Sequence, residues 1–195
     1  LFPGLDFTPI DTVKQSTKEK SGTPVIVWNH RWEHDKDPAT FFSSLYQLKK
    51  DNVPFQLIVL GQSFKNQPEC FAEARQQLAE QIIHFGYVES REKYIRLLCQ
   101  GDIAVSTANH EFFGISVLEA VRAGCYPLLP DRLSYKELFS KNYRYKDGQL
   151  TRQLTQLLCH PAKLDSQIST KLTDRFRWSV LKKDYEQWLF SSPED

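Results

Sequence analysis

The residues best suited to chemistry gather in one stretch, which runs from His110 to Gly124. It follows a short apolar run, Ile103–Ser106, that is typical of a buried strand. Gly114 precedes a pattern of apolar residues three apart, which predicts a helix that stops at Gly124. A glycine at such a turn lets the backbone approach a ligand, and the free N–H groups and positive dipole at a helix start suit a phosphate. We therefore expect an anion-binding turn around Gly114.

Two carboxylates frame this turn. Glu111 lies just before the predicted helix, and Glu119 lies in its second turn among valine, leucine and alanine. Because a carboxylate in apolar company loses its hydration, Glu119 needs either a protein partner or a ligand hydroxyl.

Two basic residues stand five apart in another loop, where Arg31 and Lys36 follow the apolar run Val25–Trp28. A planar guanidinium and a compact ammonium that face a helix start would clamp a diphosphate. Acidic residues are interleaved with them, so an ordinary charged surface loop is the alternative interpretation.

Two aromatic residues, Phe112 and Phe113, add bulk next to Gly114. We expect one ring to pack in the core and the backbone N–H groups between residues 112 and 115 to face the ligand. The alternative is that both rings belong to the core.

Three histidines, His30, His34 and His110, occupy the same two loops. Each could act as a general base or donate a hydrogen bond to an anion, although a lone loop histidine is more often incidental. His110 is the best placed because it adjoins Glu111. Their spacing is not that of metal ligands on one helix, so we expect no metal site.

Short apolar runs alternate with helical patterns along the chain. The predicted strands are 25–28, 55–60, 82–85, 103–106 and 127–129. Predicted helices fill 39–50, 68–80, 91–99, the segment between Gly114 and Gly124, 150–159 and 178–190, the last with its aromatic side chains inward. This order predicts an α/β fold with a Rossmann-like parallel β-sheet flanked by helices. Ligands bind at the C-terminal ends of such strands, where Gly61 and the 86–88 segment also lie.

Composition supports one large domain or two small ones, with 41% hydrophobic residues in a chain of 195. A net charge of +1 gives no general electrostatic case for nucleic acid or membrane. Residues 131–184, however, carry 12 Lys/Arg against 6 Asp/Glu. This basic segment either contacts a polyanion or is solvated surface.

Cys99 and Cys125 lie in apolar runs and are expected to be buried free thiols, which favours a reducing, cytoplasmic compartment. The cysteines lack the spacing of a zinc site. No apolar run reaches the roughly 18 residues of a membrane helix, and no signal peptide is visible. The sequence has no methionine, so we expect it to be a fragment of a longer protein.

Together these residues resemble the donor-binding domain of retaining GT-B glycosyltransferases of the large family four. That family has two glutamates separated by seven residues, with Phe-Gly early in the gap and Leu-Glu-Ala at its end, as in Glu111 to Glu119. Its basic pair after the first strand, its opening turn and its closing helix correspond to Arg31 with Lys36, to Phe2–Asp6 and to Phe176–Trp178.

A closer resemblance, carried by 28–38, 110–114 and 124–127, is to the group that transfers mannose from GDP-mannose to the queuosine base of aspartate tRNA. Three departures from the wider family fit this group. His30 stands in place of the usual glycine before the arginine, and Asp37 replaces the glycine after the lysine. Phe112 stands where many relatives have glycine.

The resemblance implies a role for each of these residues. It assigns catalysis to Arg31 and Lys36 on the donor diphosphate and to Glu111 beside the sugar hydroxyls. It assigns donor binding to His110, Phe112, Phe113, Gly114, Ile115, Ser116 and Glu119, with Glu119 on the ribose. It places the nucleobase beside Gly61, Tyr87 and Val88. The nucleotide sugar is a substrate, so no cofactor is expected.

A GT-B enzyme closes its site between two domains. We expect 1–195 to be the C-terminal, nucleotide-sugar-binding one, with 1–23 as an opening and linker segment and 24–195 as the Rossmann-like core with closing helices. The acceptor-binding N-terminal domain, which would engage tRNA, lies outside these residues, and the isolated domain should be inactive. The alternatives are the same domain with another nucleotide-sugar donor and a glycan or lipid acceptor, or a non-catalytic nucleotide-sugar-binding module.

Overall fold

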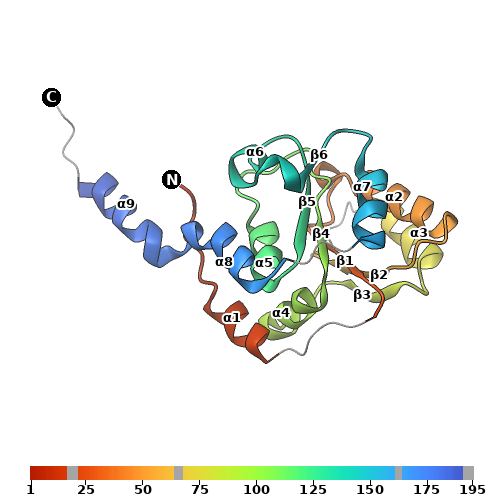
Figure 1. The fold of residues 1–195 in the computed structure, drawn as a ribbon, viewed down its shortest axis with the longest axis horizontal. Helices are drawn as coiled ribbons and strands as arrows, with labels where there is room; N and C mark the ends of the chain where they lie inside the picture. The colour runs from red at the N-terminus through yellow and green to blue at the C-terminus, as the bar shows by residue number, and fades with distance from the viewer. Residues whose placement is uncertain (17–21, 64–67, 161–163, 191–195) are drawn as a thin grey trace.

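The computed structural model describes residues 1–16, 22–63, 68–160 and 164–190, which form a three-layer α/β arrangement (Figure 1). One sheet holds all six strands in the order β3-β2-β1-β4-β5-β6, and every pairing is parallel. The strands are β1 Val25–Asn29, β2 Gln56–Leu60, β3 Ile82–Gly86, β4 Ile103–Val105, β5 Tyr126–Pro130 and β6 Arg144–Tyr145. The predicted parallel sheet is therefore confirmed. The strand order reverses between β1 and β4, where sheets of this kind bind ligands.

Helices cover both faces of the sheet (Figure 1). One face carries α1 Thr8–Gln15, α4 Arg91–Gln100, α5 Ile115–Ala123 and α6 Tyr135–Leu138. The other face carries α2 Pro38–Lys50, α3 Cys70–Gln77 and α7 Leu150–Cys159. Helix α8 (Ser166–Thr173) packs on α5, and α9 (Trp178–Phe190) ends the described chain. The short 3-10 turns are η1 His34–Lys36, η2 Lys141–Tyr143 and η3 Asp174–Phe176.

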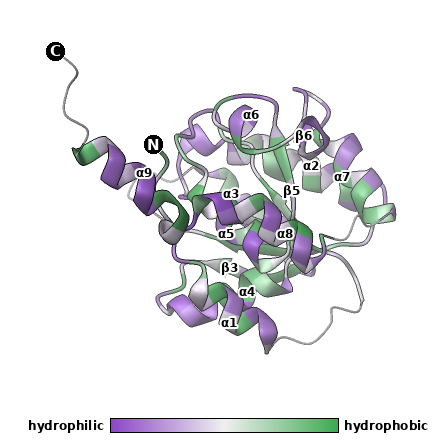
Figure 2. Cartoon of the chain, turned by 60° about the vertical axis from the view of Figure 1, so that its left-hand side comes forward, coloured by the Kyte–Doolittle hydropathy of each residue, from purple (hydrophilic) through white to green (hydrophobic). Residues whose placement is uncertain are grey.

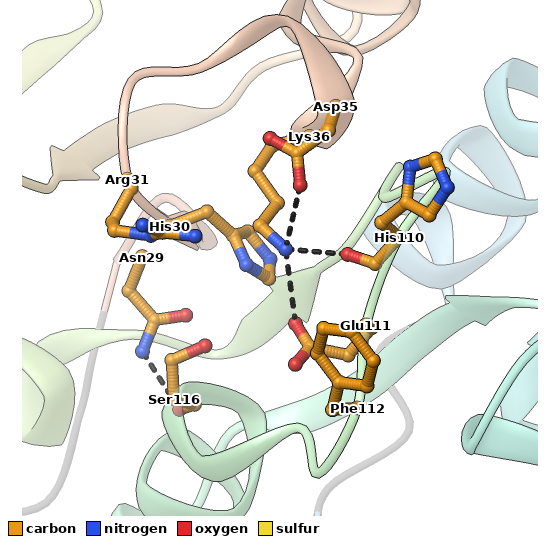
Figure 3. A pocket seen from close by; sticks show the side chains of 9 residues that line it. All are labelled: Asn29, His30, Arg31, Asp35, Lys36, His110, Glu111, Phe112 and Ser116. Carbon is orange, nitrogen blue, oxygen red and sulfur yellow. Dashed lines mark hydrogen bonds and ion pairs between the residues drawn. The ribbon is translucent and has the colours of Figure 1, made fainter.

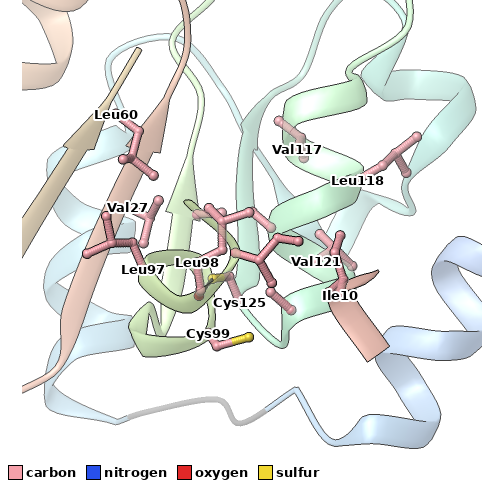
Figure 4. Packing of buried hydrophobic residues seen from close by; sticks show 14 of the residues in the cluster. Ile10, Val27, Leu60, Leu97, Leu98, Cys99, Val117, Leu118, Val121 and Cys125 are labelled. Carbon is pink, nitrogen blue, oxygen red and sulfur yellow. Dashed lines mark hydrogen bonds between the residues drawn. The ribbon is translucent and has the colours of Figure 1, made fainter. Parts of the chain in front are cut away.

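The alternation of side chains along β1 explains the two cores. Val25 and Val27 belong to the core under α1, α4 and α5, whereas Ile26 and Trp28 belong to the core under α2, α3 and α7. Successive side chains of a strand point to opposite faces, so a strand buried on both sides must be apolar throughout. Figure 4 shows the first core, where Val27 lies among side chains of α4 and α5. Cys99 and Cys125 lie in this core as buried cysteines that form no disulfide, as predicted.

The prediction that α9 turns its aromatic side chains inward is wrong. Leu181 is the buried residue of this helix, whereas Trp178, Trp188 and Phe190 are 50%, 66% and 81% exposed. The helix extends away from the sheet, so its far end meets no other described layer (Figure 2). The periodicity of the sequence predicted the helix correctly, but it could not indicate whether another element covers the helix's apolar side chains.

The opening segment contributes to the core as well. Helix α1 lies within residues 1–23 and buries Ile10 and Val13 against α4 and α5. Residues 17–21 of the predicted loop lie outside the described residues. Helix α3 is shorter than the predicted 68–80, and α1, α6, β6 and α8 were not predicted.

A buried arginine ties the C-terminal end of α5 to the surrounding helices. Arg122 is 4% exposed and donates to Asp11 of α1 at 2.7 Å and to Asp174 of η3 at 2.8 Å. Arg177 donates to the same two carboxylates, at 2.8 and 2.7 Å. Burial opposes the charged form of Asp11, but these hydrogen bonds outweigh it and hold the pKa of Asp11 below its usual value. This ion-pair cluster fixes the end of α5 that is remote from the loops.

Replacing Arg122 with methionine should lower the free energy of unfolding by about 2–3 kcal/mol, since it leaves two acidic groups with one partner. The loss is smaller than for a fully buried pair because Asp11 and Asp174 are 30% and 44% exposed. Urea unfolding measures it. The matched control is Arg96→Met, which breaks the exposed pair with Glu92 and should cost about 0.5 kcal/mol or less. Equal losses in the two variants would show that this cluster contributes no more to the free energy of unfolding than an exposed ion pair does.

Candidate functional site

The first wall of the site is the loop that leaves β1. Asn29 ends the strand, and the chain then makes the short turn η1, which places Asp35 and Lys36 over the sheet edge. Asp37 follows in the left-handed region, at φ 46°, and its side chain accepts a hydrogen bond from the Thr40 N–H at the start of α2. This left-handed residue turns the chain sharply, so that η1 stays at the edge while α2 runs back along the sheet.

The loop that leaves β4 is joined to the first loop by hydrogen bonds to two of its backbone carbonyls. The Asn109 N–H donates to the Asp35 carbonyl at 2.7 Å, and the Thr107 hydroxyl donates to the Lys36 carbonyl at 2.7 Å. On its other side Arg132 donates to the carbonyls of Thr107 and Ala108 at 3.0 and 3.1 Å. The β4 loop is therefore held from both sides.

Lys36 lies at the centre of the two loops. The residue is 7% exposed, and its ammonium lies 3.2 Å from the Asp35 carboxylate and 3.6 Å from the Glu111 carboxylate. It also donates a short hydrogen bond to the His110 carbonyl. A buried ammonium needs such partners because it has lost its hydration.

The start of α5 faces these groups. Gly114 precedes the helix with φ 62° and ψ 32°, and its N–H donates to the Glu111 carboxylate at 3.1 Å. Asn29 donates to the Ser116 carbonyl at 2.8 Å, which ties the first turn of α5 to the end of β1. Glu111 thus links the helix start to Lys36.

Glu119, in the second turn of α5, finds protein partners. Arg91 donates to one carboxylate oxygen and the Tyr94 hydroxyl donates to the other at 2.9 Å. Tyr94 in turn accepts from Asn29 at 3.2 Å. Burial raises the pKa of Tyr94 above its usual value, and the Glu119 charge adds to this. This answers the sequence-based question of what accompanies Glu119: a tyrosine and an arginine of α4 do.

A cavity of about 270 Å³ lies between the two loops and the helix start (Figure 3). Its lining residues are Asn29, His30, Arg31, Asp35, Lys36, His110, Glu111, Phe112 and Ser116. Of the predicted site residues, the structure therefore brings together Arg31, Lys36, His110, Glu111, Phe112 and Ser116. The volume is below the roughly 300–1,000 Å³ of a complete small-molecule site, so the cavity can enclose only part of a larger ligand.

The other predicted residues lie outside the cavity lining. Phe113, Gly114 and Ile115 form the adjoining turn, and Glu119 lies one helical turn further along α5. Gly61, Tyr87 and Val88 follow β2 and β3, at the same edge of the sheet. Gly61 has φ 140°, and a β-carbon there would lie 1.9 Å from the His30 carbonyl oxygen, so only glycine fits. Tyr87 is 60% exposed and Val88 packs partly on the first core.

The expectation that Phe112 or Phe113 packs in the core is wrong. Phe112 is 82% exposed and Phe113 is 42% exposed. The left-handed Gly114 turns the chain directly into α5, and both rings remain on the outer side of that turn. Phe112 instead lines the mouth of the cavity.

His30 contributes a buried imidazole that lies on the cavity wall. It is 4% exposed, and its Nε2 is among the buried side-chain atoms without a hydrogen-bond partner in the described chain. Such an atom costs about 1–3 kcal/mol. Burial, with a further contribution from Lys36, lowers the pKa of His30 to about 4 although Glu111 opposes the shift. The imidazole is therefore neutral at neutral pH.

Sequence reasoning did not assign Asn29, Asp35, Arg91 or Tyr94 to the site. Asn29 carried a usable signal, because a polar residue at the last position of an apolar strand lies at the ligand-binding edge of a parallel sheet. Arg91 and Tyr94 carried none, since only the packing of α4 beside α5 brings them to Glu119. Within the described residues no group of three or more His, Cys, Asp and Glu could hold a metal ion, and no helix is long and apolar enough to cross a membrane.

The fold and the site define an α/β domain with a parallel sheet and a polar cavity at the carboxyl ends of its strands. The family model of the glycosyl transferases group 1 matches residues 9–172, and the chain belongs to this family. The chain is 42% identical over 130 residues to the tRNA-queuosine alpha-mannosyltransferase of Drosophila melanogaster. That match covers 66% of this chain and 34% of the fly protein, so the chain spans about a third of that relative.

Solved structures share the fold at low sequence identity. HepE of Anabaena, crystallised in complex with UDP, has a TM-score of 0.72 and 15% identity, over 97% of this chain and 54% of HepE. The C-terminal domain of LpcC, a group 1 glycosyl transferase of Francisella tularensis, has a TM-score of 0.61 and 18% identity, over 94% of this chain and 95% of that domain. The sheet and its helices thus match GT-B glycosyltransferase folds, as the sequence predicted.

Gly114→Ala should lower the free energy of unfolding by about 1–2 kcal/mol, because a side chain is strained in the left-handed region. The new β-carbon would also lie 3.2 Å from Leu138 and 3.3 Å from Tyr135. Gly148→Ala is the matched control: its φ is 75° but nothing lies within 4 Å of the new β-carbon. Chemical denaturation of both variants should show the larger loss at Gly114. A smaller loss of stability in Gly114→Ala than in Gly148→Ala would contradict this prediction and would show that the turn can adjust to a side chain.

Proposed function

We propose that this chain is the donor-binding half of a retaining glycosyltransferase that transfers mannose from GDP-mannose to queuosine in aspartate tRNA. The single observation that supports it most is the cavity at the start of α5, which Arg31, Lys36 and Glu111 all line. The 42% identity to a tRNA-queuosine alpha-mannosyltransferase supports the choice of sugar and acceptor.

The chemical difficulty is departure of the nucleoside diphosphate while positive charge grows on the anomeric carbon. In this proposal Arg31, Lys36 and the N–H groups at the start of α5 stabilise the negative charge on the leaving diphosphate. Such fixed charges require little reorganisation during the reaction. No metal and no cofactor take part.

The two glutamates and the outer residues hold the remaining parts of the donor. Glu111 accepts from sugar hydroxyls, and Glu119 accepts from the ribose hydroxyls with the lone pairs that Arg91 and Tyr94 leave open. His110, Phe112 and the backbone of residues 113–116 contact the sugar and phosphates. Gly61, Tyr87 and Val88 flank the nucleobase.

Binding of a diphosphate must change the partners of Lys36. Its ammonium now neutralises Asp35 and Glu111, and Arg31 is paired with Glu33 at 3.1 Å. Arg31 is 60% exposed, so it can turn to the ligand at little cost, whereas Lys36 can keep its position and exchange Glu111 for a phosphate oxygen. Glu111 is then free to accept a sugar hydroxyl.

The acceptor proposal rests on the fly relative rather than on surface charge. Several cations of the basic segment 131–184 are used inside the domain. They are Arg132 with Asp147, Arg144 with Asp131, Arg175 with the Glu137 and Leu138 carbonyls, and Arg177 with Asp11 and Asp174.

We infer that a further domain of the full-length protein holds the acceptor and that residues 1–195 alone do not catalyse transfer. The buried thiols favour a reducing, cytoplasmic setting.

Two assays separate this proposal from its alternatives. Titration of the full-length protein with GDP-mannose, UDP-glucose and ADP-glucose identifies the donor, and mannosylation of tRNA with and without queuosine identifies the acceptor. Transfer to a glycan or lipid would support the same domain in a different enzyme. Nucleotide-sugar binding without any transfer would support a non-catalytic module.

In the full-length enzyme, Arg31→Ala and Lys36→Ala should each lower kcat by about 10²–10³, as removal of one stabilising donor does elsewhere. Steady-state kinetics with saturating donor measures the effect. The control is Lys50→Ala, which removes an exposed cation at the end of α2, remote from the lining residues. Wild-type turnover in either site variant would refute the diphosphate assignment.

A further inference from the structure

The unpartnered nitrogen of His30 is the feature of the cavity that the proposed function does not use. The imidazole packs edge-on against Trp28, with ring centroids 5.1 Å apart, so its orientation is constrained. Figure 3 shows the ring among the lining residues, beside the Lys36 ammonium and above Glu111 and Ser116. A buried polar atom on the wall of a cavity lowers its free energy when a ligand supplies the missing hydrogen bond.

The hydrogen bonds of the ring decide which kind of group that is. His30 forms a hydrogen bond with the backbone of Val105, and Nε2 is the nitrogen without a partner. Because a backbone carbonyl can only accept and Nε2 has no partner, the proton is assigned to Nδ1, which leaves a lone pair on Nε2. Nε2 must therefore meet a donor.

The neighbouring groups narrow the choice of donor. A phosphate oxygen is excluded at Nε2, because two lone pairs would face each other. The Lys36 ammonium already donates to the His110 carbonyl and contacts Asp35 and Glu111. His30 and Glu111 both line the cavity, and Nε2 and the Glu111 carboxylate are two acceptors, which suits a group with several hydroxyls. A hexose is such a group, and a diphosphate is not.

We propose that Nε2 of His30 accepts a hydrogen bond from a hydroxyl of the transferred sugar, which makes His30 a residue that determines sugar specificity. This inference rests on the proposed function, because it takes the ligand to be a nucleotide sugar. His30 acts on the sugar alone, whereas Arg31 and Lys36 act on the diphosphate.

The test separates the sugar from the nucleotide. Calorimetric titration of the full-length protein uses GDP-mannose, UDP-glucose and ADP-glucose, each paired with its free nucleoside diphosphate. For the donor that binds, His30→Leu should weaken binding of the nucleotide sugar about tenfold to a hundredfold and change binding of the free diphosphate less than about threefold. His30→Gln should stay within about threefold of the wild type, because its amide oxygen can replace Nε2 as acceptor.

The matched control is His34→Leu, which makes the same change at an exposed histidine of the same loop that does not line the cavity. A second readout varies the ligand, and its wild-type arm needs no variant that could misfold: monodeoxy forms of the donor sugar are titrated against the wild type and against His30→Leu. One of them should lose the same factor in the wild type and lose nothing further in His30→Leu.

The outcomes are distinguishable. If no nucleotide sugar binds the wild type, the proposed function fails and this inference fails with it. A donor may bind the wild type while His30→Leu weakens binding of the nucleotide sugar and of the free diphosphate equally, or weakens neither. In that case only the inference about His30 is overturned. The same holds if every monodeoxy donor binds the wild type as tightly as the parent sugar does.

Discussion

The buried ammonium of Lys36 is the interaction on which the rest of the site depends. An ammonium taken out of water costs several kcal/mol unless opposite charges and acceptors surround it. Asp35 supplies one charge from the β1 loop, and Glu111 and the His110 carbonyl supply the rest from the β4 loop. Because these partners come from two loops far apart in sequence, satisfying Lys36 forces the loops together and shapes the cavity between them.

Helix α5 supplies the opposite wall, and the domain holds it at both ends. At its start, Asn29 bonds the Ser116 carbonyl, and Tyr94 and Arg91 bond Glu119. At its other end, Arg122 bonds α1 and η3. A helix fixed in this way keeps its positive end at a constant position over the sheet edge. Preorganised dipoles of this kind stabilise developing charge without reorganising during a reaction.

The site in this state is close to electrically balanced, because each cation of the cavity has an acidic neighbour. Arg31 pairs with Glu33, and Lys36 lies between Asp35 and Glu111. A diphosphate would therefore replace some of these carboxylates as the partner of Arg31 and Lys36, rather than bind to cations that have no partner. The neutral His30 adds an acceptor without altering this balance, so the cavity offers separate positions to an anion and to hydroxyl groups.

Periodicity and end signals in the sequence were sufficient for the parallel sheet and for most of its helices. A strand buried on both faces must be apolar, and glycine or proline often lies near its ends, so β1, β2 and β4 could be located by local rules. Short elements such as α6 and β6 escaped, because two to four residues show no period. The sequence also could not predict which aromatic side chains are exposed. The aromatic residues of α9 and the ring of Phe112 have the residue types of a core but lie at the surface.

By itself the sequence determined that Arg31, Lys36 and Glu111 follow strands of a parallel sheet, because the apolar runs and the loops after them can be read from local pattern. It also determined that a glycine opens α5. That β1 and β4 are neighbours was decided by the tertiary structure. Only the tertiary structure decided which atoms meet. Lys36 contacts Asp35 and Glu111, Glu119 accepts from Arg91 and Tyr94, and Nε2 of His30 has no hydrogen-bond partner in the described chain. The physical reason is that hydrogen bonds and ion pairs act over a few ångströms in space, and spacing along the chain does not record those distances.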